Sequence, residues 1–199
     1  MADQKKPVDN PERVPTDTKD HARIISVDHM APCLDTARLH QLEQAFRKWA
    51  VDSPRADVRV SRLRILITFL LIRYTGAKLN EVLALDLFQD IDKEKHAVIY
   101  GGTGSDTASK SRTVHLSESL CHEVLELIRT PLFREKQDRM PDLDPGFVRR
   151  KFYERAAACG FAKKLGGPEA IRRARAVELC RAICPCPQSR KSWDTPPPV

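Results

Sequence analysis

Six basic residues stand out because their surroundings would present them to an anion. Lys78 lies in the stretch TGAKLNEVLALD, where one helical pattern stops at Gly76 and another begins at once. The first turn of a helix carries free N–H groups, so a lysine at this corner is well placed to bind phosphate. The other five candidates lie in the stretches SKSRTVHL and GGPEAIRRARA: Lys110, Arg112, Arg172, Arg173 and Arg175.

The three arginines do not share one face of the helix predicted at 168–183. Arg172 and Arg175 are three residues apart and are therefore neighbours on the helix surface. Arg173 points away from Arg172 by about 100°. The pattern favours Arg172 and Arg175 for phosphate contact over Arg173. For Lys78, and for Lys110 and Arg112 on a hairpin, simple exposure to solvent is the alternative interpretation.

The positive charge of the chain is concentrated near its C-terminal end. The 199 residues carry a formal net charge of +7, and residues 145–191 alone hold twelve Lys and Arg against three Asp and Glu. Residues 1–28 hold five Lys and Arg against six Asp and Glu. So local an excess of positive charge favours a nucleic-acid partner over an ordinary solvated helix face.

Two long helices are predicted before the corner. Residues 35–50 have an apolar stripe at spacings of three and four, and Asp35 can cap the helix. Residues 58–74 become apolar on all sides in their second half, which predicts the central buried helix. A short helix over 79–85 then follows the corner.

The pattern after the corner changes to short strands and then returns to helices. Residues 96–100 and 111–116 read as two strands joined by a polar linker rich in Gly and Ser, which predicts a hairpin. That linker lacks the spacing of a P-loop. The remaining predicted segments are helix 117–129, loop 130–143, a helix that begins at Asp144-Pro145 and ends near 159, and helix 168–183. The fold class is therefore mainly α, an α+β domain with one small β-hairpin.

Composition sets the outline of the chain. Residues 1–28 are rich in Pro, Asp and Lys and are predicted to be a disordered tail, 29–183 the domain, and 184–199 an irregular Pro-rich tail. No apolar run is long enough to span a bilayer and no secretory signal is present, so we expect a cytoplasmic protein without a membrane partner. The six cysteines are scattered without a CxxC pair, so we expect reduced thiols and neither a metal site nor a cofactor.

Four stretches occur in an order that resembles the catalytic domain of the tyrosine recombinase (phage integrase) family. They are TGAKLNEVLALDLFQDID, SKSRTVHL, DPGFVRRKFYERAAACGF and GGPEAIRRARAVELCRA. The resemblance covers roughly residues 35–183 and implies a helical recombinase-like fold. In that family an arginine at the corner grips the scissile phosphate, a lysine lies on the hairpin, and a later H-x-L-R box supplies a histidine and a second arginine.

The sequence departs from this family pattern at chemically decisive positions. Lys78 takes the place of the first arginine and Glu169 that of the histidine, while Glu81, Lys110 and Arg172 match the pattern. A lysine lacks the bidentate fork of an arginine, and a carboxylate repels phosphate. The family's nucleophile is a tyrosine that follows the H-x-L-R box. The tyrosines of this sequence all precede the matching stretch: Tyr74, Tyr100 and Tyr153. We therefore expect no catalytic residue and no enzyme activity.

The resulting expectation is a non-catalytic DNA-binding protein with double-stranded DNA as its partner, acting as a transcriptional regulator. Degenerate recombinase-like domains occur in molybdate- or tungstate-responsive regulators, and the resemblance extends to that type. Family members carry an N-terminal domain that closes the clamp on DNA, so a chain with half a clamp is a possible homodimer. Two alternatives stay open: a truncated or decayed phage integrase, and a protein-interaction domain with a basic surface.

Overall fold

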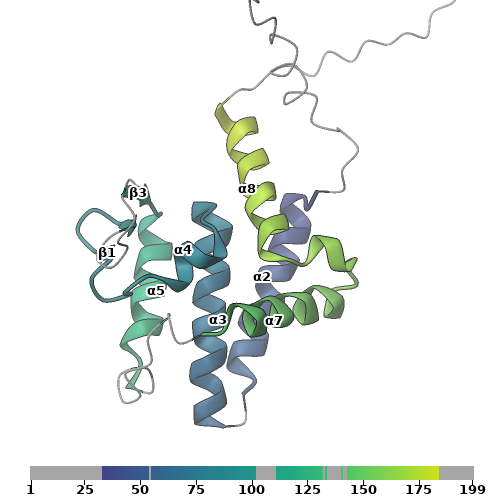
Figure 1. Cartoon of the computed structure of the whole chain (residues 1–199), viewed down its shortest axis with the longest axis horizontal. Coiled ribbons are helices and arrows are strands. Elements are labelled where there is room, and N and C mark those ends of the chain that lie inside the picture. Colours follow the sequence, from purple (N-terminus) through teal and green to yellow (C-terminus); the bar gives the residue numbers. More distant parts are fainter. Residues whose placement is uncertain are drawn as a thin grey trace, which may run out of the picture. The chain divides into compact units, whose positions relative to one another are not determined.

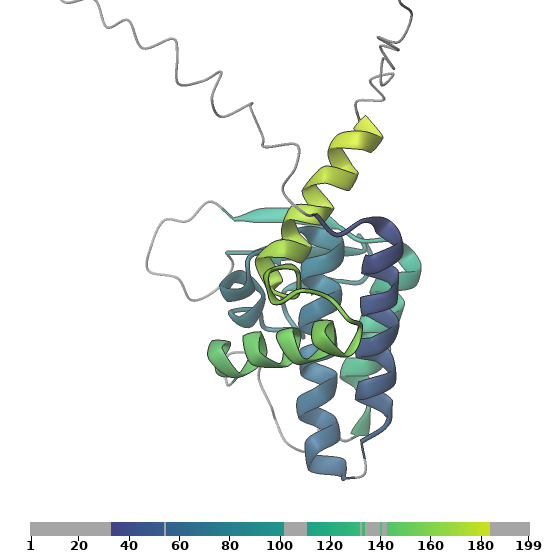
Figure 2. The same cartoon turned by 90° about the vertical axis from the view of Figure 1, so that its right-hand side faces the viewer.

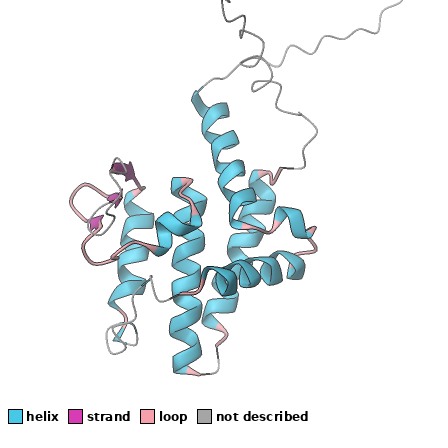
Figure 3. Ribbon diagram, in the orientation of Figure 1, coloured by secondary structure: helices cyan, strands magenta, loops and turns pink. Residues whose placement is uncertain are grey.

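The computed structural model contains six α-helices, three short strands and one 3-10 turn among its described residues (Figures 1 and 3). The residues whose structure is described are 33–53, 55–101, 111–131, 133, 140 and 143–183. The prediction of a mainly helical α+β fold is confirmed. The predicted tails 1–28 and 184–199, Lys110 and most of the predicted loop 130–143 lie outside the described residues.

Two antiparallel neighbours, α2 (Thr36–Val51) and α3 (Ala56–Thr75), form the centre of the fold. The Asp35 carboxylate caps α2 by accepting a hydrogen bond from the Arg38 N–H at 2.8 Å. Every residue of α3 from Leu63 to Arg73 is buried, so this helix is surrounded by the others, as its apolar sequence predicts.

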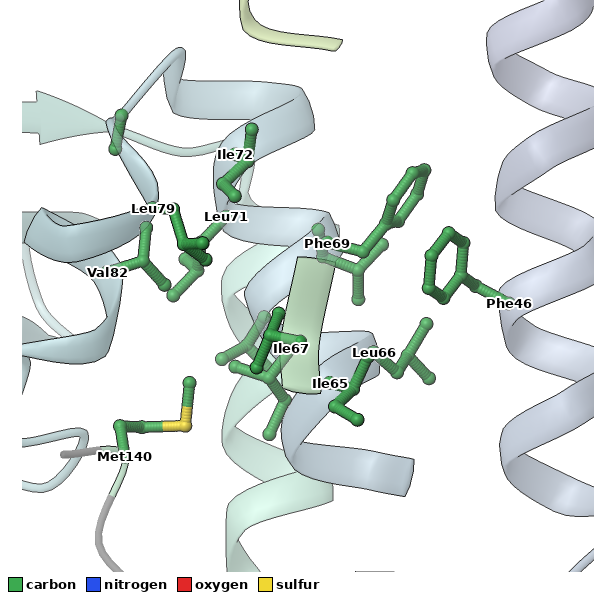
Figure 4. Packing of buried hydrophobic residues seen from close by; sticks show 14 of the residues in the cluster. Phe46, Ile65, Leu66, Ile67, Phe69, Leu71, Ile72, Leu79, Val82 and Met140 are labelled. Atoms are coloured by element: carbon green, nitrogen blue, oxygen red, sulfur yellow. The ribbon is translucent and has the colours of Figure 1, made fainter. Parts of the chain in front are cut away.

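An aromatic cluster joins α2 and α3 to α7 (Pro145–Ala158), which runs across them in both views (Figures 1 and 2). The rings of Phe46 and Phe69 stack with their centroids 4.4 Å apart, and Figure 4 shows the two side chains facing each other. Phe152 of α7 meets the Phe46 ring edge-on at 5.0 Å. These contacts fix α7 on the central helices.

The sheet has one strand more than the predicted hairpin. β2 (Ala97–Tyr100) pairs antiparallel with β3 (Arg112–His115), and Tyr100 lies opposite Arg112. The additional strand, β1 (Ile91–Asp92), pairs with the other edge of β2. A strand of two residues is too short to show alternation of apolar and polar residues, which is why the sequence did not reveal it.

The remaining helices lie close to their predicted positions. The short helix α4 (Leu79–Leu83) ends two residues before its predicted end, and α5 (Glu118–Arg129) follows the sheet. η2 (Lys163–Leu165) precedes α8 (Pro168–Ile183), whose first half packs on α3 while its last turns project away from the core (Figure 2). None of the helices in the described ranges has the length and apolar character needed to cross a membrane.

Candidate anion-binding site at the α3–α4 corner

The corner between α3 and α4 is held in place by the buried Thr75 hydroxyl. This hydroxyl donates to the Leu71 carbonyl at 2.6 Å and lies 2.9 Å from the Tyr100 hydroxyl of β2. Burial raises the pKa of Tyr100 to about 12, so its hydroxyl stays protonated and can donate to Thr75. Gly76 then ends α3 in the left-handed conformation with φ of 68°, which glycine adopts without steric cost.

Glu81 links the corner to the sheet. Its carboxylate accepts the Lys78 backbone N–H at 2.7 Å and an N–H of the Arg112 guanidinium at 2.8 Å. Partial burial opposes ionisation, but these hydrogen bonds outweigh it and hold the pKa of Glu81 below its usual value. The Arg112 guanidinium also lies over the Tyr100 ring, 4.7 Å from its centroid. Arg112 is therefore anchored beside Lys78.

Arg172 brings α8 to the same corner. Its Nε donates to the Gly76 carbonyl at 3.0 Å, and its Nη1 lies 3.0 Å from a carboxylate oxygen of Glu169 one turn earlier. The Glu169 side chain is 66% exposed and that of Arg172 is 36% exposed. Two stretches almost a hundred residues apart in sequence thus meet through a direct hydrogen bond.

A pocket of about 290 Å³ opens where these elements meet. Its lining includes Lys78, Arg172 and Glu169, three positions that the sequence singled out. The other lining residues are Ala77, Leu79, Asn80, Arg149, Tyr153, Gly167 and Pro168. Three basic side chains and one acidic side chain give the lining a formal charge of +2. A concave site with this charge is suited to a tetrahedral oxyanion such as phosphate.

The sequence reasoning missed two residues of this pocket, Arg149 and Tyr153. They lie one turn apart on α7 and so point from the same face of that helix. The four-residue spacing is visible in the sequence, but only the crossing of α7 over α2 and α3 decides that this face meets the corner. In the sequence, Arg149 is adjacent to Arg150 and Lys151 and so looks like part of a general basic run.

Two glycines allow α7 to come this close to the start of α8. A Cβ on Gly166 would lie 2.4 Å from the Ala156 Cβ, and one on Gly167 would lie 3.2 Å from the Tyr153 hydroxyl. Contacts this short leave no space for a side chain at Gly166. Because Gly166 and Gly167 have no side chains, the Tyr153 side chain can lie directly against the start of α8.

The other described residues among the six, Arg112, Arg173 and Arg175, do not line the pocket. Arg173 is exposed. The Arg175 Nε donates to the Tyr74 carbonyl at 3.0 Å, and its Nη1 lies 3.5 Å from Glu178. Arg175 is thus engaged within the protein, although it is three residues from Arg172 as expected. DNA contact by any of the six basic residues stays a prediction.

Within the described ranges, no group of three or more His, Cys, Asp or Glu side chains could hold a metal ion. The cysteines described there are free thiols: Cys33, Cys121, Cys159 and Cys180.

Comparisons with known proteins support the fold. No protein-family model matches the chain, and a search of curated proteins finds no significant match. Among solved structures, the chain is similar to the XerH site-specific recombinase bound to difH substrate in a pre-cleavage complex, with a TM-score of 0.55 and 21% identity over 76% of this chain. It is also similar to the post-cleavage complex of XerH with palindromic difH substrate, with a TM-score of 0.60 and 19% identity over 78% of this chain.

The match covers 43% and 44% of the two XerH chains, so this chain spans less than half their length. At this level of identity the likeness concerns the fold, and the chain has a tyrosine-recombinase-like fold.

Proposed function

We propose that this chain, through its recombinase-like fold, binds duplex DNA without cutting it and acts as a transcriptional regulator. The observation that carries the proposal is the positively charged pocket at the corner, where Lys78 and Arg172 converge from α4 and α8. Phosphate contacts supply most of the sequence-independent affinity of such proteins, and they do not require catalytic chemistry. The XerH structures were determined with DNA substrate bound, which supports a DNA partner for the shared fold.

The proposed loss of cleavage rests on the charges in the pocket. A cleavage site must stabilise the extra negative charge of a phosphorane, for which donors in a fixed fork are effective. Lys78 offers charge without a fork, and Glu169 places a carboxylate 3.0 Å from the guanidinium of Arg172. Lys78 and Arg172 can still hold a phosphate in the ground state, but with Glu169 beside them they stabilise the transition state poorly.

A decayed or truncated phage integrase is the second candidate, and the likeness to the fold of XerH enzymes favours it equally. The two candidates differ in the nucleotide sequence that encodes the region after about residue 182. A His and Tyr pattern of the family type in another reading frame there would favour decay. A covalent protein–DNA adduct on a nicked duplex would contradict the absence of cleavage.

The main test is a salt titration in which fluorescence anisotropy measures the binding of duplex DNA. We expect Lys78→Ala and Arg172→Ala each to weaken binding and to reduce the slope of log affinity against log salt by about one. Lys48→Ala and Arg129→Ala remove exposed charges outside the pocket and serve as matched controls.

The proposal fails if both pocket variants bind DNA as the controls do. Binding that is absent at low salt, or unchanged between low and moderate salt, would instead favour a protein-interaction domain that uses its basic surface for an acidic partner.

A further inference from the structure

The basic run on α7 contains three residues that look alike in sequence and differ in their surroundings. The Arg150 guanidinium lies 5.2 Å from the centroid of the Phe147 ring, and the Lys151 ammonium pairs with Glu154 at 2.7 Å. Arg149 is exposed, has no ion pair within the described part of the chain, and lines the pocket. Arg149 is therefore the member of the run that is available to an anion.

Tyr153 joins Arg149 on the same wall of the pocket. Its ring is held against the two glycines before α8 and by the Lys163 ammonium, 5.7 Å from its centroid. Its hydroxyl has no hydrogen bond to any described residue, although it lies beside the first turn of α8. A phenol O–H in this position can donate to an anion in the pocket.

The pocket thus has three walls with different roles. The α4 wall offers the flexible ammonium of Lys78, and the α8 wall offers Arg172, whose charge is partly offset by Glu169. The α7 wall offers the hydroxyl of Tyr153 and the guanidinium of Arg149, which has no ion pair with any residue that the structure describes. The volume, about 290 Å³, is at the small end of ligand pockets and suits one phosphate group with part of what it is attached to.

We propose that Arg149 and Tyr153 are phosphate ligands that hold a bound phosphate in its ground state from the α7 wall of the pocket. The phosphate is a single tetrahedral group held between α4, α7 and α8. Its source as a backbone phosphate of DNA rests on the function proposed above, whereas the site itself also takes free orthophosphate. The positive charge of Arg149 then offsets the negative charge of Glu169, which partly neutralises Arg172.

Two measurements on the full chain test this site: calorimetric titration with orthophosphate at constant ionic strength, and duplex-DNA anisotropy across a salt series. The decisive pair is Arg149→Ala against Arg150→Ala, because the two arginines are adjacent and exposed on one helix and only Arg149 lines the pocket. Tyr153→Phe keeps the ring against the glycines and removes only the hydroxyl. Thermal melting verifies that each variant is folded.

We expect Arg149→Ala to weaken both orthophosphate and DNA binding about tenfold and to lower the salt slope by about one. Tyr153→Phe should weaken both about threefold and leave the salt slope unchanged, because it removes no charge. Arg150→Ala should change orthophosphate binding less than twofold, or about 0.4 kcal/mol.

The proposal is overturned if Arg149→Ala and Arg150→Ala bind both ligands equally. If the duplex binds with dependence on Lys78 and Arg172 but not on Arg149, the proposed function stands and the α7 wall does not. If orthophosphate binds with dependence on Arg149 while the duplex does not bind, the phosphate site stands and the DNA partner is wrong.

Discussion

Among the described residues that line the pocket, Glu169 carries the one acidic side chain. Its carboxylate pairs with Arg172 at 3.0 Å and occupies the position where the recombinase pattern has a histidine. The pair is of the i, i+3 kind and largely exposed, so it contributes little to stability. Its effect should therefore appear in anion binding, where a nearby negative charge repels the ligand.

Replacing Glu169 with glutamine is expected to tighten duplex-DNA binding about two- to fivefold at low salt, because the change removes a repelling charge and releases Arg172. Fluorescence anisotropy with a short duplex measures the effect. Glu118→Gln is the matched control, since Glu118 is also an exposed acid in the first turn of a helix but lies outside the pocket.

Weaker binding by Glu169→Gln would show that Glu169 serves to orient Arg172 and that its charge does not oppose the ligand. Equal changes in Glu169→Gln and Glu118→Gln would mean that only the overall charge of the chain matters.

At the scale of elements, the position of α8 depends on Glu178. Its carboxylate accepts two hydrogen bonds from the Arg73 guanidinium of α3, at 2.6 and 2.9 Å, and a third from Thr36 of α2 at 3.2 Å. The Arg73 side chain is only 9% exposed. Partial burial opposes ionisation of Glu178, but the bonds from Arg73 outweigh it and keep its pKa below the ordinary 4.5.

Glu178→Gln is expected to lower the free energy of unfolding by about 2 kcal/mol at neutral pH, because it leaves Arg73 buried without its counter-charge. The folded pKa of Glu178 is lowered, so its contribution is present above the unfolded pKa and disappears as the pH falls through the folded pKa. The difference between wild type and variant should therefore shrink between about pH 6 and pH 3. Urea denaturation across this range measures it.

Glu126→Gln breaks an exposed pair with Arg129 and is the control, with an expected loss under about 0.5 kcal/mol. A pH-independent difference for Glu178→Gln would mean that packing of the side chain, rather than its charge, holds α8.

At the scale of the whole molecule, the core is what turns separate helices into one binding surface. Phe152, in the middle of α7, is fully buried against Phe46 of α2 and Phe69 of α3. The same helix also contains Arg149 and Tyr153. Loss of this anchor would release the third wall of the pocket along with part of the core.

Phe152→Ala is expected to lower the free energy of unfolding by about 3–5 kcal/mol through lost burial and the cavity left behind. Denaturant titration measures this, with Phe88→Ala as the control because the Phe88 side chain is 62% exposed. A similar small loss in both variants would contradict the role of Phe152 as the anchor of α7.

Much of the secondary structure follows from local sequence. Asp35, Ser117 and Asp144 each accept a backbone N–H at a helix start, and Gly76 ends α3, all at or near the predicted positions. Capping and apolar periodicity act over a few residues, so the chain itself displays them. The two-residue strand β1 has no such local signal, because its formation depends on pairing with β2.

The candidate site divides in the same way. The sequence determined that Lys78 lies at a helix corner and that Arg172 and Glu169 begin a later helix, and the resemblance to recombinases related the two. Only the tertiary structure decided that Arg149 and Tyr153 complete the pocket while Arg175 is bound to Tyr74 and Glu178. The physical reason is that hydrogen bonds between near neighbours set where a helix begins and ends. Contacts between distant segments, such as Phe152 with Phe46, set which of its faces meets the site.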